Sequence, residues 1–151
     1  MNAGIPSGTF SLDGGVLLEM LLGTSMGEPI VEALTSNSIV AYTSHVNISE
    51  AEYILCRKLG PELARSKTGA LVNSNYVTIV EAEKLYSIAA EIKCTRALAL
   101  ADCYCLALAK ATGSNALFAF SEEELLKEIS RKPFDVEIVF LKDIVPRRRA
   151  G

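Results

Sequence analysis

The chain alternates short apolar segments with longer segments of helical pattern, and this alternation restricts the fold more than any other feature. The short segments predict strands at 8–12, 38–42, 76–80, 116–120 and 136–141. The longer segments predict helices at 16–22, after 28–29, and at 47–58, 62–72, 81–93, 97–111 and 121–130. Such alternation is typical of parallel sheets covered by helices. We therefore predict a three-layer α/β/α fold with a central, mainly parallel five-stranded sheet, in which 76–80 is a central strand.

The length and the charge of the chain limit its organisation. Its 151 residues, half of them apolar, suffice for one hydrophobic core, so we expect a single domain over 1–145 and a basic tail over 146–151. The formal net charge is −3. An acidic surface repels polyanions, so any contact with nucleic acid requires a local basic patch or bound cations. This charge disfavours a general DNA-coating role.

Neither a secretory leader nor an apolar segment of the roughly 18 to 20 residues needed to span a bilayer is visible, so we expect a cytoplasmic protein. The four cysteines contain no C-x-x-C pair and only one histidine accompanies them, which disfavours a structural zinc site. We expect buried free thiols, with a disulfide as the alternative in a hyperthermophile.

Asp102 is the only charged residue in the apolar segment 97–109, which predicts a buried helix. A buried carboxylate requires a partner, a bound cation or a proton. The alternative to a bound cation is a hydrogen bond to the backbone or an ion pair with Arg96.

Further carboxylates follow predicted strands, where the ligand crevice of an open α/β sheet lies. Asp13 follows the first strand and precedes two glycines, although it also suits the N-cap of the next helix. Glu50 follows the second strand and also completes a capping box with Asn47. Glu122 and Glu124 follow the fourth strand, where Ser121 and Glu124 match the same capping pattern. Carboxylates that converge repel one another unless a cation such as Mg²⁺ or Mn²⁺ binds them.

Other residues give weaker indications. His45, the only histidine, has no recognisable nucleophile motif beside it, and we expect it at the surface. The common glycine-rich nucleotide-binding motifs are absent. Lys93 and Arg96 precede the Asp102 helix and are candidates to neutralise a phosphate, with a solvated helix end as the alternative.

The order of the acidic residues resembles that of the PIN-domain family over nearly the whole chain. The similarity comprises Asp13 after a strand, Ser49-Glu50 at the start of a helix that carries Tyr53, and Asp102 within an Ala-rich helix. The sequence departs from the family where Gly14-Gly15 replaces a small polar residue and where Glu122 to Glu124 replace a Thr or Ser followed by Asp. Which glutamate takes the fourth acidic position is left open.

The resemblance implies a metal-dependent endoribonuclease that hydrolyses RNA phosphodiester bonds, as in the toxins of toxin–antitoxin pairs. It implies catalytic roles for Asp13, Glu50, Asp102 and Glu124, and ligation of Mg²⁺ or Mn²⁺ by these four and Glu122. It also implies a single-stranded or structured RNA substrate, a homodimer and a small antitoxin partner, without a membrane. We expect Arg147 to Arg149 in the tail to increase RNA affinity, with a disordered solubilising end as the alternative.

Two other functions are compatible with the sequence. The first is a PIN-fold module that has lost catalysis with its fourth carboxylate and binds RNA or a protein partner. The second is a phosphatase or phosphotransferase with Asp13 as nucleophile, which Gly15 disfavours because it occupies the place of the second aspartate.

Overall fold

A single sheet of five parallel strands organises the computed structural model, which describes residues 4–145. The strands are β1 (Gly8–Leu12), β2 (Ile39–Ser44), β3 (Val77–Val80), β4 (Asn115–Phe118) and β5 (Ile138–Phe140), and their order is β3-β2-β1-β4-β5. The predicted parallel five-stranded sheet is confirmed. The expectation that 76–80 is a central strand is wrong, because β3 pairs only with β2 and lies at an edge.

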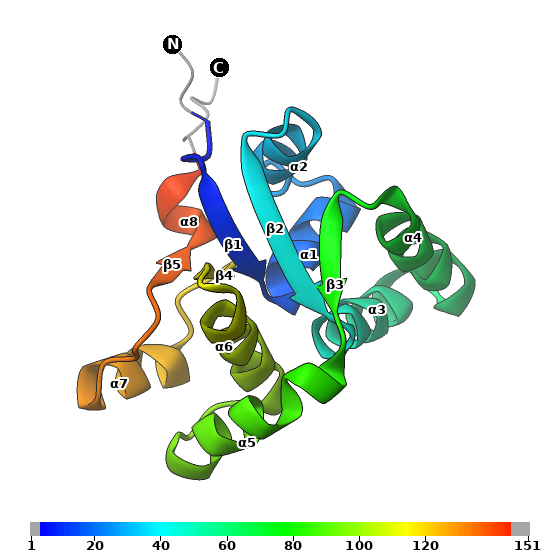
Figure 1. The fold of residues 1–151 in the computed structure, drawn as a ribbon. Helices are drawn as coiled ribbons and strands as arrows, with labels where there is room; N and C mark the ends of the chain where they lie inside the picture. The colour runs from blue at the N-terminus through cyan, green and yellow to red at the C-terminus, as the bar shows by residue number, and fades with distance from the viewer. Residues whose placement is uncertain (1–3, 146–151) are drawn as a thin grey trace.

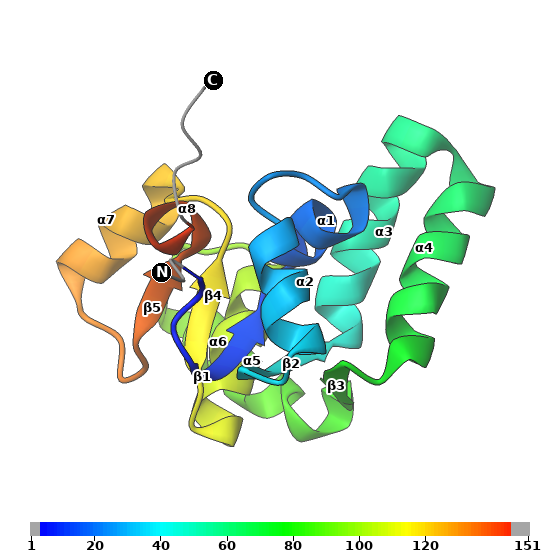
Figure 2. The same cartoon turned by 90° about the horizontal axis from the view of Figure 1, so that it is seen from above.

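Helices cover both faces of the sheet, so the predicted three-layer α/β/α fold is also confirmed (Figures 1 and 2). The helices are α1 (Gly14–Leu22), α2 (Glu28–Thr35), α3 (His45–Leu59), α4 (Pro61–Ser74), α5 (Tyr86–Thr95), α6 (Leu100–Thr112), α7 (Glu123–Arg131) and α8 (Leu141–Ile144). Figure 2 shows α1 and α2 on one side of the sheet and α5 and α6 on the other. A short 3-10 helix, Ala82–Lys84, precedes α5.

The central strand β1 shows how two cores form on opposite faces of the sheet. Phe10 and Leu12 belong to the core beneath α1 and α2. Ser11 points to the other face, where its hydroxyl donates to the carbonyl oxygen of Cys105 on α6 at 2.8 Å. Because successive strand residues face opposite sides, β1 packs against both helical layers at once. Its carboxyl end, where Asp13 follows, is therefore firmly held.

Three helices begin elsewhere than the sequence predicts, two of them at positions that differ from the predicted caps. α3 begins at His45 with Ser44 as its N-cap, and Asn47 is fully buried within the first turn. α7 has Glu122 rather than Ser121 at its N-cap position, without a side-chain cap bond. α6 begins only at Leu100, because Ala99 is extended. Ser44, placed one helical turn before Asn47, supplies the capping oxygen that the sequence pattern assigns to Asn47.

The state of the cysteines and the exposure of His45 agree in part with the sequence predictions. The four cysteines are free thiols, of which Cys103 and Cys105 are buried as expected, whereas Cys94 is exposed. His45 is exposed, as expected. In the described part of the chain, no helix is both long enough and apolar enough to cross a bilayer. The tail over 146–151, with its predicted role in RNA binding, lies outside the described residues.

Candidate functional site

Asp13 lies at the carboxyl end of the central strand and begins α1. Its backbone N–H donates to the carbonyl oxygen of Leu117 on β4 at 3.1 Å. Its side-chain Oδ1 accepts from the backbone N–H of Val16 at 2.9 Å, so Asp13 is the N-cap of α1, as the alternative interpretation proposed. The same residue also occupies the sheet edge where ligands bind in open α/β folds. The two roles are therefore compatible at this position.

The carboxyl group of Glu50, on α3, lies close to the backbone at position 14 because Gly14 has no side chain. A β-carbon at Gly14 would lie 2.2 Å from Oε1 of Glu50, far inside van der Waals contact. Glycine is thus required at position 14 for Glu50 to take its present place. The glycine pair in the sequence indicated a close approach of some group to the backbone. The structure identifies the group as the Glu50 carboxyl.

Asp102 lies in the first turn of α6 and not in a helix interior. α6 runs back across the sheet to β4, so its first turn lies at the same sheet edge as the ends of β1 and β2 (Figure 1). The residue is buried, with 9% of its surface exposed. A carboxylate at this position faces the positive end of the helix dipole, which partly offsets the cost of burial.

Glu122 and Glu124 are both exposed, and both follow β4. Glu122 occupies the N-cap position of α7, and its backbone N–H donates to the carbonyl oxygen of Phe120 at 3.1 Å. Glu124 lies in the first turn of the same helix. Of the two, Glu122 is electrostatically coupled to both Glu50 and Asp102, whereas Glu124 is coupled to Asp102. We therefore define the acidic cluster as Asp13, Glu50, Asp102 and Glu122.

Asp13, Glu50 and Asp102 of the acidic cluster hold their protons more tightly than ordinary carboxyl groups do, because their pKa values are raised. Burial, together with repulsion from Glu50 and Asp102, raises the pKa of Asp13 to about 8, although the N–H groups of Val16 and Gly15 oppose this rise. Burial and repulsion from Glu122, Glu50 and Glu124 raise the pKa of Asp102 to about 7. Burial and Glu122 also raise the pKa of Glu50. A positive charge beside these carboxylates would therefore stabilise their ionised forms.

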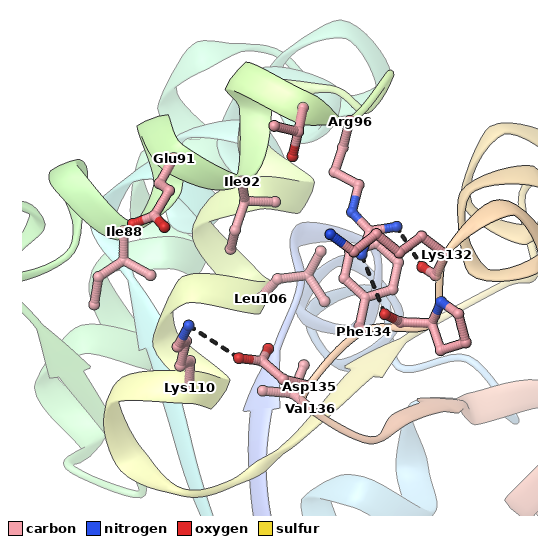
Figure 3. A pocket seen from close by; sticks show the side chains of 12 residues that line it. Ile88, Glu91, Ile92, Arg96, Leu106, Lys110, Lys132, Phe134, Asp135 and Val136 are labelled. Atoms are coloured by element: carbon pink, nitrogen blue, oxygen red, sulfur yellow. Dashed lines mark hydrogen bonds and ion pairs between the residues drawn. The ribbon is translucent and has the colours of Figure 1, made fainter.

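Within residues 4–145, no lysine, arginine or histidine forms an ion pair with a carboxylate of the acidic cluster. The proposed pairing of Asp102 with Arg96 is wrong. Arg96 lies 3.7 Å from Glu128, donates to carbonyl oxygens of the C-terminal segment and stacks on the Phe134 ring (Figure 3). These same contacts occupy Arg96, so it is not placed to neutralise a phosphate. Lys93 donates to the carbonyl oxygen of Leu98 at 2.6 Å.

One pocket of the molecule lies away from the acidic cluster. A cavity of about 330 Å³ lies between α5, α6 and the segment 132–136, beside Arg96 and the Lys110–Asp135 ion pair (Figure 3). None of the acidic cluster lines it. This cavity is therefore separate from the acidic cluster at the sheet edge.

The donor chemistry of the acidic cluster fits a hard divalent cation. Carboxylate oxygens are the ligands that Mg²⁺ prefers, and a cation removes the repulsion that raises the pKa values of Asp13 and Asp102. Within residues 4–145, no three acidic, cysteine or histidine side chains have the geometry to hold a metal ion as they stand. Binding therefore requires the flexible glutamates to turn toward Asp13 and Asp102.

Comparison with known proteins gives one family and several solved structures of similar fold. The sequence matches the PIN domain family over residues 11–139. No curated protein matches it. The fold is similar to that of VapC20 from Mycobacterium tuberculosis, described as a sarcin-ricin loop cleaving toxin, with a TM-score of 0.62, 20% identity and coverage of 79% of this chain and 94% of that one. VapBC2 from Rickettsia felis, bound to a DNA fragment from their promoter, gives a TM-score of 0.60, 13% identity and coverage of 87% and 98%.

Proposed function

This chain belongs to the PIN domain family, and on that premise we propose that it is a metal-dependent endoribonuclease, the toxin of a toxin–antitoxin pair. The observation that carries the proposal is the acidic cluster, in which the buried carboxylates Asp13 and Asp102 lack a basic partner among the described residues. Their raised pKa values are the electrostatic signature of a site that binds a cation.

In this proposal Asp13, Glu50 and Asp102 hold Mg²⁺ or Mn²⁺, and a glutamate after β4 completes the ligand set. When bound, the cation supplies a lowered water pKa and positive charge beside the scissile phosphate. The protein residues hold carboxylate oxygens at the carboxyl edge of the parallel sheet, where ligands bind in open α/β folds. A serine, cysteine or histidine nucleophile is not required.

Glu122 is the better candidate for the fourth ligand. Its charge raises the pKa values of both Glu50 and Asp102, so Glu122 lies within electrostatic range of both carboxylates. Glu124, by contrast, is coupled to Asp102 and not to Glu50. We propose Glu122 as the ligand and keep Glu124 as the alternative.

The similar structures guide the choice of substrate and partner. VapC20 is described as a toxin that cleaves the sarcin-ricin loop, and VapBC2 as bound to promoter DNA. We propose by analogy that this chain cleaves RNA, forms a homodimer and is silenced by a small antitoxin. A role for Arg147 to Arg149 in RNA affinity is part of this proposal.

A binding module without catalysis is the second candidate. The exposure of both Glu122 and Glu124 favours it, because a fully exposed fourth carboxylate is less rigidly held than a buried one. The two candidates differ in whether the purified protein hydrolyses RNA.

Cleavage of single-stranded RNA is expected in Mg²⁺ or Mn²⁺, and it is expected to stop in EDTA. Asp13→Asn should lower cleavage by about a hundredfold or more, because loss even of groups that merely support metal ligands costs about 10- to 100-fold. Asparagine retains an oxygen for the Val16 N–H, so the α1 cap survives. Gel assays of wild type and Asp13→Asn, with the exposed Asp143→Asn as control, measure the effect. Equal cleavage in EDTA contradicts the metal mechanism, and unchanged cleavage by Asp13→Asn contradicts the site.

Gly14→Ala is expected to weaken Mn²⁺ binding by about tenfold with little loss of stability. The added methyl group meets the far end of the flexible Glu50 side chain, which can turn away at small cost but then leaves the acidic cluster. Gly69→Ala is the matched control, since a β-carbon there meets nothing within 4 Å and a helical Gly-to-Ala change stabilises by about 0.5 to 1 kcal/mol. Calorimetric titration with Mn²⁺ measures both. Wild-type affinity in Gly14→Ala contradicts the role of Glu50.

A further inference from the structure

We propose that Asn47 is a positioning residue that fixes the spacing between Glu50 and Asp102 by joining α3 to the first turn of α6. The Asn47 side chain is fully buried. Its Nδ2 donates to the carbonyl oxygen of Ala101 at 3.0 Å, and its Oδ1 accepts from the hydroxyl of Ser44 at 2.7 Å. This inference rests on the proposed function, because it concerns the ligands of the proposed metal site.

The placement of the bond ties it directly to the two carboxylates. Asn47 precedes Glu50 by three residues on α3, so the two side chains lie on the same helix face about one turn apart. Ala101 immediately precedes Asp102 in the chain. The Asn47–Ala101 hydrogen bond therefore connects the backbone next to one carboxylate with the helix turn that carries the other.

An uncharged hydrogen-bonding side chain can hold α3 and α6 together beside the two carboxylates. Glu50 and Asp102 repel each other, and basic residues do not join them within the described chain. A neutral amide resists that repulsion without neutralising the carboxylates, and so leaves them available to a cation. A basic residue at position 47 would instead compete with the metal for both.

The Asn47 amide supplies one hydrogen-bond donor and one acceptor, and its two partners need one of each. The Ala101 carbonyl needs a donor, and the Ser44 hydroxyl, which itself accepts from the Asn47 backbone N–H at 3.2 Å, needs an acceptor. Alanine satisfies neither, and serine is too short to reach across to α6. Removing the amide therefore frees the first turn of α6 from α3.

Thr68 provides a matched control for a purely structural role. It is also buried and also joins α3 to a neighbouring helix, through a hydrogen bond from its hydroxyl to Oε1 of Glu52 at 2.5 Å. That bond lies between α3 and α4, whereas Asn47 faces α6. A variant at Thr68 thus perturbs the packing of α3 without touching the proposed metal ligands.

Calorimetric titration with Mn²⁺, well below the melting temperature, tests the role of Asn47. Asn47→Ala is expected to bind Mn²⁺ about 10- to 100-fold more weakly than wild type, and its RNA cleavage should recover as Mn²⁺ approaches saturation. Thr68→Val should bind Mn²⁺ within about twofold of wild type even where it melts at a lower temperature. If Asn47→Ala does not fold, Asn47→Ser is used, with the same expected loss.

Two results overturn the inference: wild-type Mn²⁺ affinity in the folded Asn47 variant, or an equal loss of affinity in Thr68→Val. Failure of the proposed function is recognised separately, since wild type then binds no Mn²⁺. A crystal structure of the metal-free Asn47 variant decides the positioning role in that case. A changed separation of the Glu50 and Asp102 backbones supports it, and an unchanged separation overturns it.

Discussion

Without divalent metal, the protein is expected to lose on the order of 6 kcal/mol of folding stability between pH 5 and pH 8. Burial raises the pKa of Asp13 to about 8 and that of Asp102 to about 7, whereas an unfolded aspartate has a pKa of about 3.9. In this pH range the folded state therefore binds more protons than the unfolded state. The contribution of these two groups to stability is therefore fully present below the unfolded pKa and is lost as pH rises through the folded values.

Saturating Mn²⁺ or Mg²⁺ should reverse this trend. A cation favours the ionised carboxylates, so its binding to the native state becomes stronger as pH rises and stabilises the fold by mass action. Thermal melting from pH 5 to pH 8, with Mn²⁺ and with EDTA, measures the effect. A metal-free melting temperature that does not fall with pH contradicts the electrostatic account of the acidic cluster.

Asp102→Asn provides the matched test of the same cluster. Removing this charge relieves the repulsion around Asp13 and Glu50, so the metal-free variant should melt at or above the wild-type temperature at pH 8. Metal should then stabilise the variant much less than wild type. Asp135→Asn makes the same chemical change at an exposed ion pair with Lys110, where a loss of at most about 1 kcal/mol is expected. A clear fall in melting temperature of Asp102→Asn that is indifferent to metal indicates a structural aspartate instead.

Glu128→Ala is expected to lower the melting temperature by about 10 °C. The Glu128 side chain is 8% exposed and accepts from the guanidinium of Arg131 at 2.7 Å. It also lies 3.7 Å from Arg96, whose side chain is equally buried. The bonds from Arg131 hold the pKa of Glu128 below its ordinary value. Truncation leaves the buried Arg96 without its carboxylate and removes one of the contacts that join α7 to the segment before α6.

The surface pair Glu123–Lys127 on the same helix is the control for this prediction. Both side chains are more than 70% exposed, so Glu123→Ala should change the melting temperature by no more than about 2 °C. Thermal melts of the two variants under identical conditions give the comparison. Equal effects at positions 123 and 128 contradict a structural role for the Glu128 contacts.

The sequence alone was sufficient for the order along the chain of the strands and of helices α1 to α7, although it did not predict α8. The strand at 8–12 followed by Asp13 was predictable because apolar periodicity and a turn signal act over a few residues. Parallel strands then bring Asp13 and the residues after β2 and β4 to one edge of the sheet. These inferences need only local pattern and the rules of parallel topology.

The local capping pattern failed at the start of α3. Ser44 and Asn47 are both good capping residues, but only Asn47 precedes a glutamate by three positions, and the sequence pattern therefore favoured Asn47. The structure gives the cap to Ser44 because the Asn47 amide is engaged by Ala101, which lies 54 residues further along the chain. The place of β3 at the sheet edge is equally non-local, since strand order depends on which strands pair.

What the sequence determined by itself is thus the fold class, the alternation of elements and the carboxylates available at the sheet edge. Only the tertiary structure decided that Arg96 pairs with Glu128 instead of Asp102, and that Gly14 makes room for Glu50. The physical reason is the sequence distance over which each effect acts. Hydrophobic periodicity and turn preferences act between near neighbours in sequence. Burial, charge coupling and close approach depend instead on segments that meet only when the whole chain has packed.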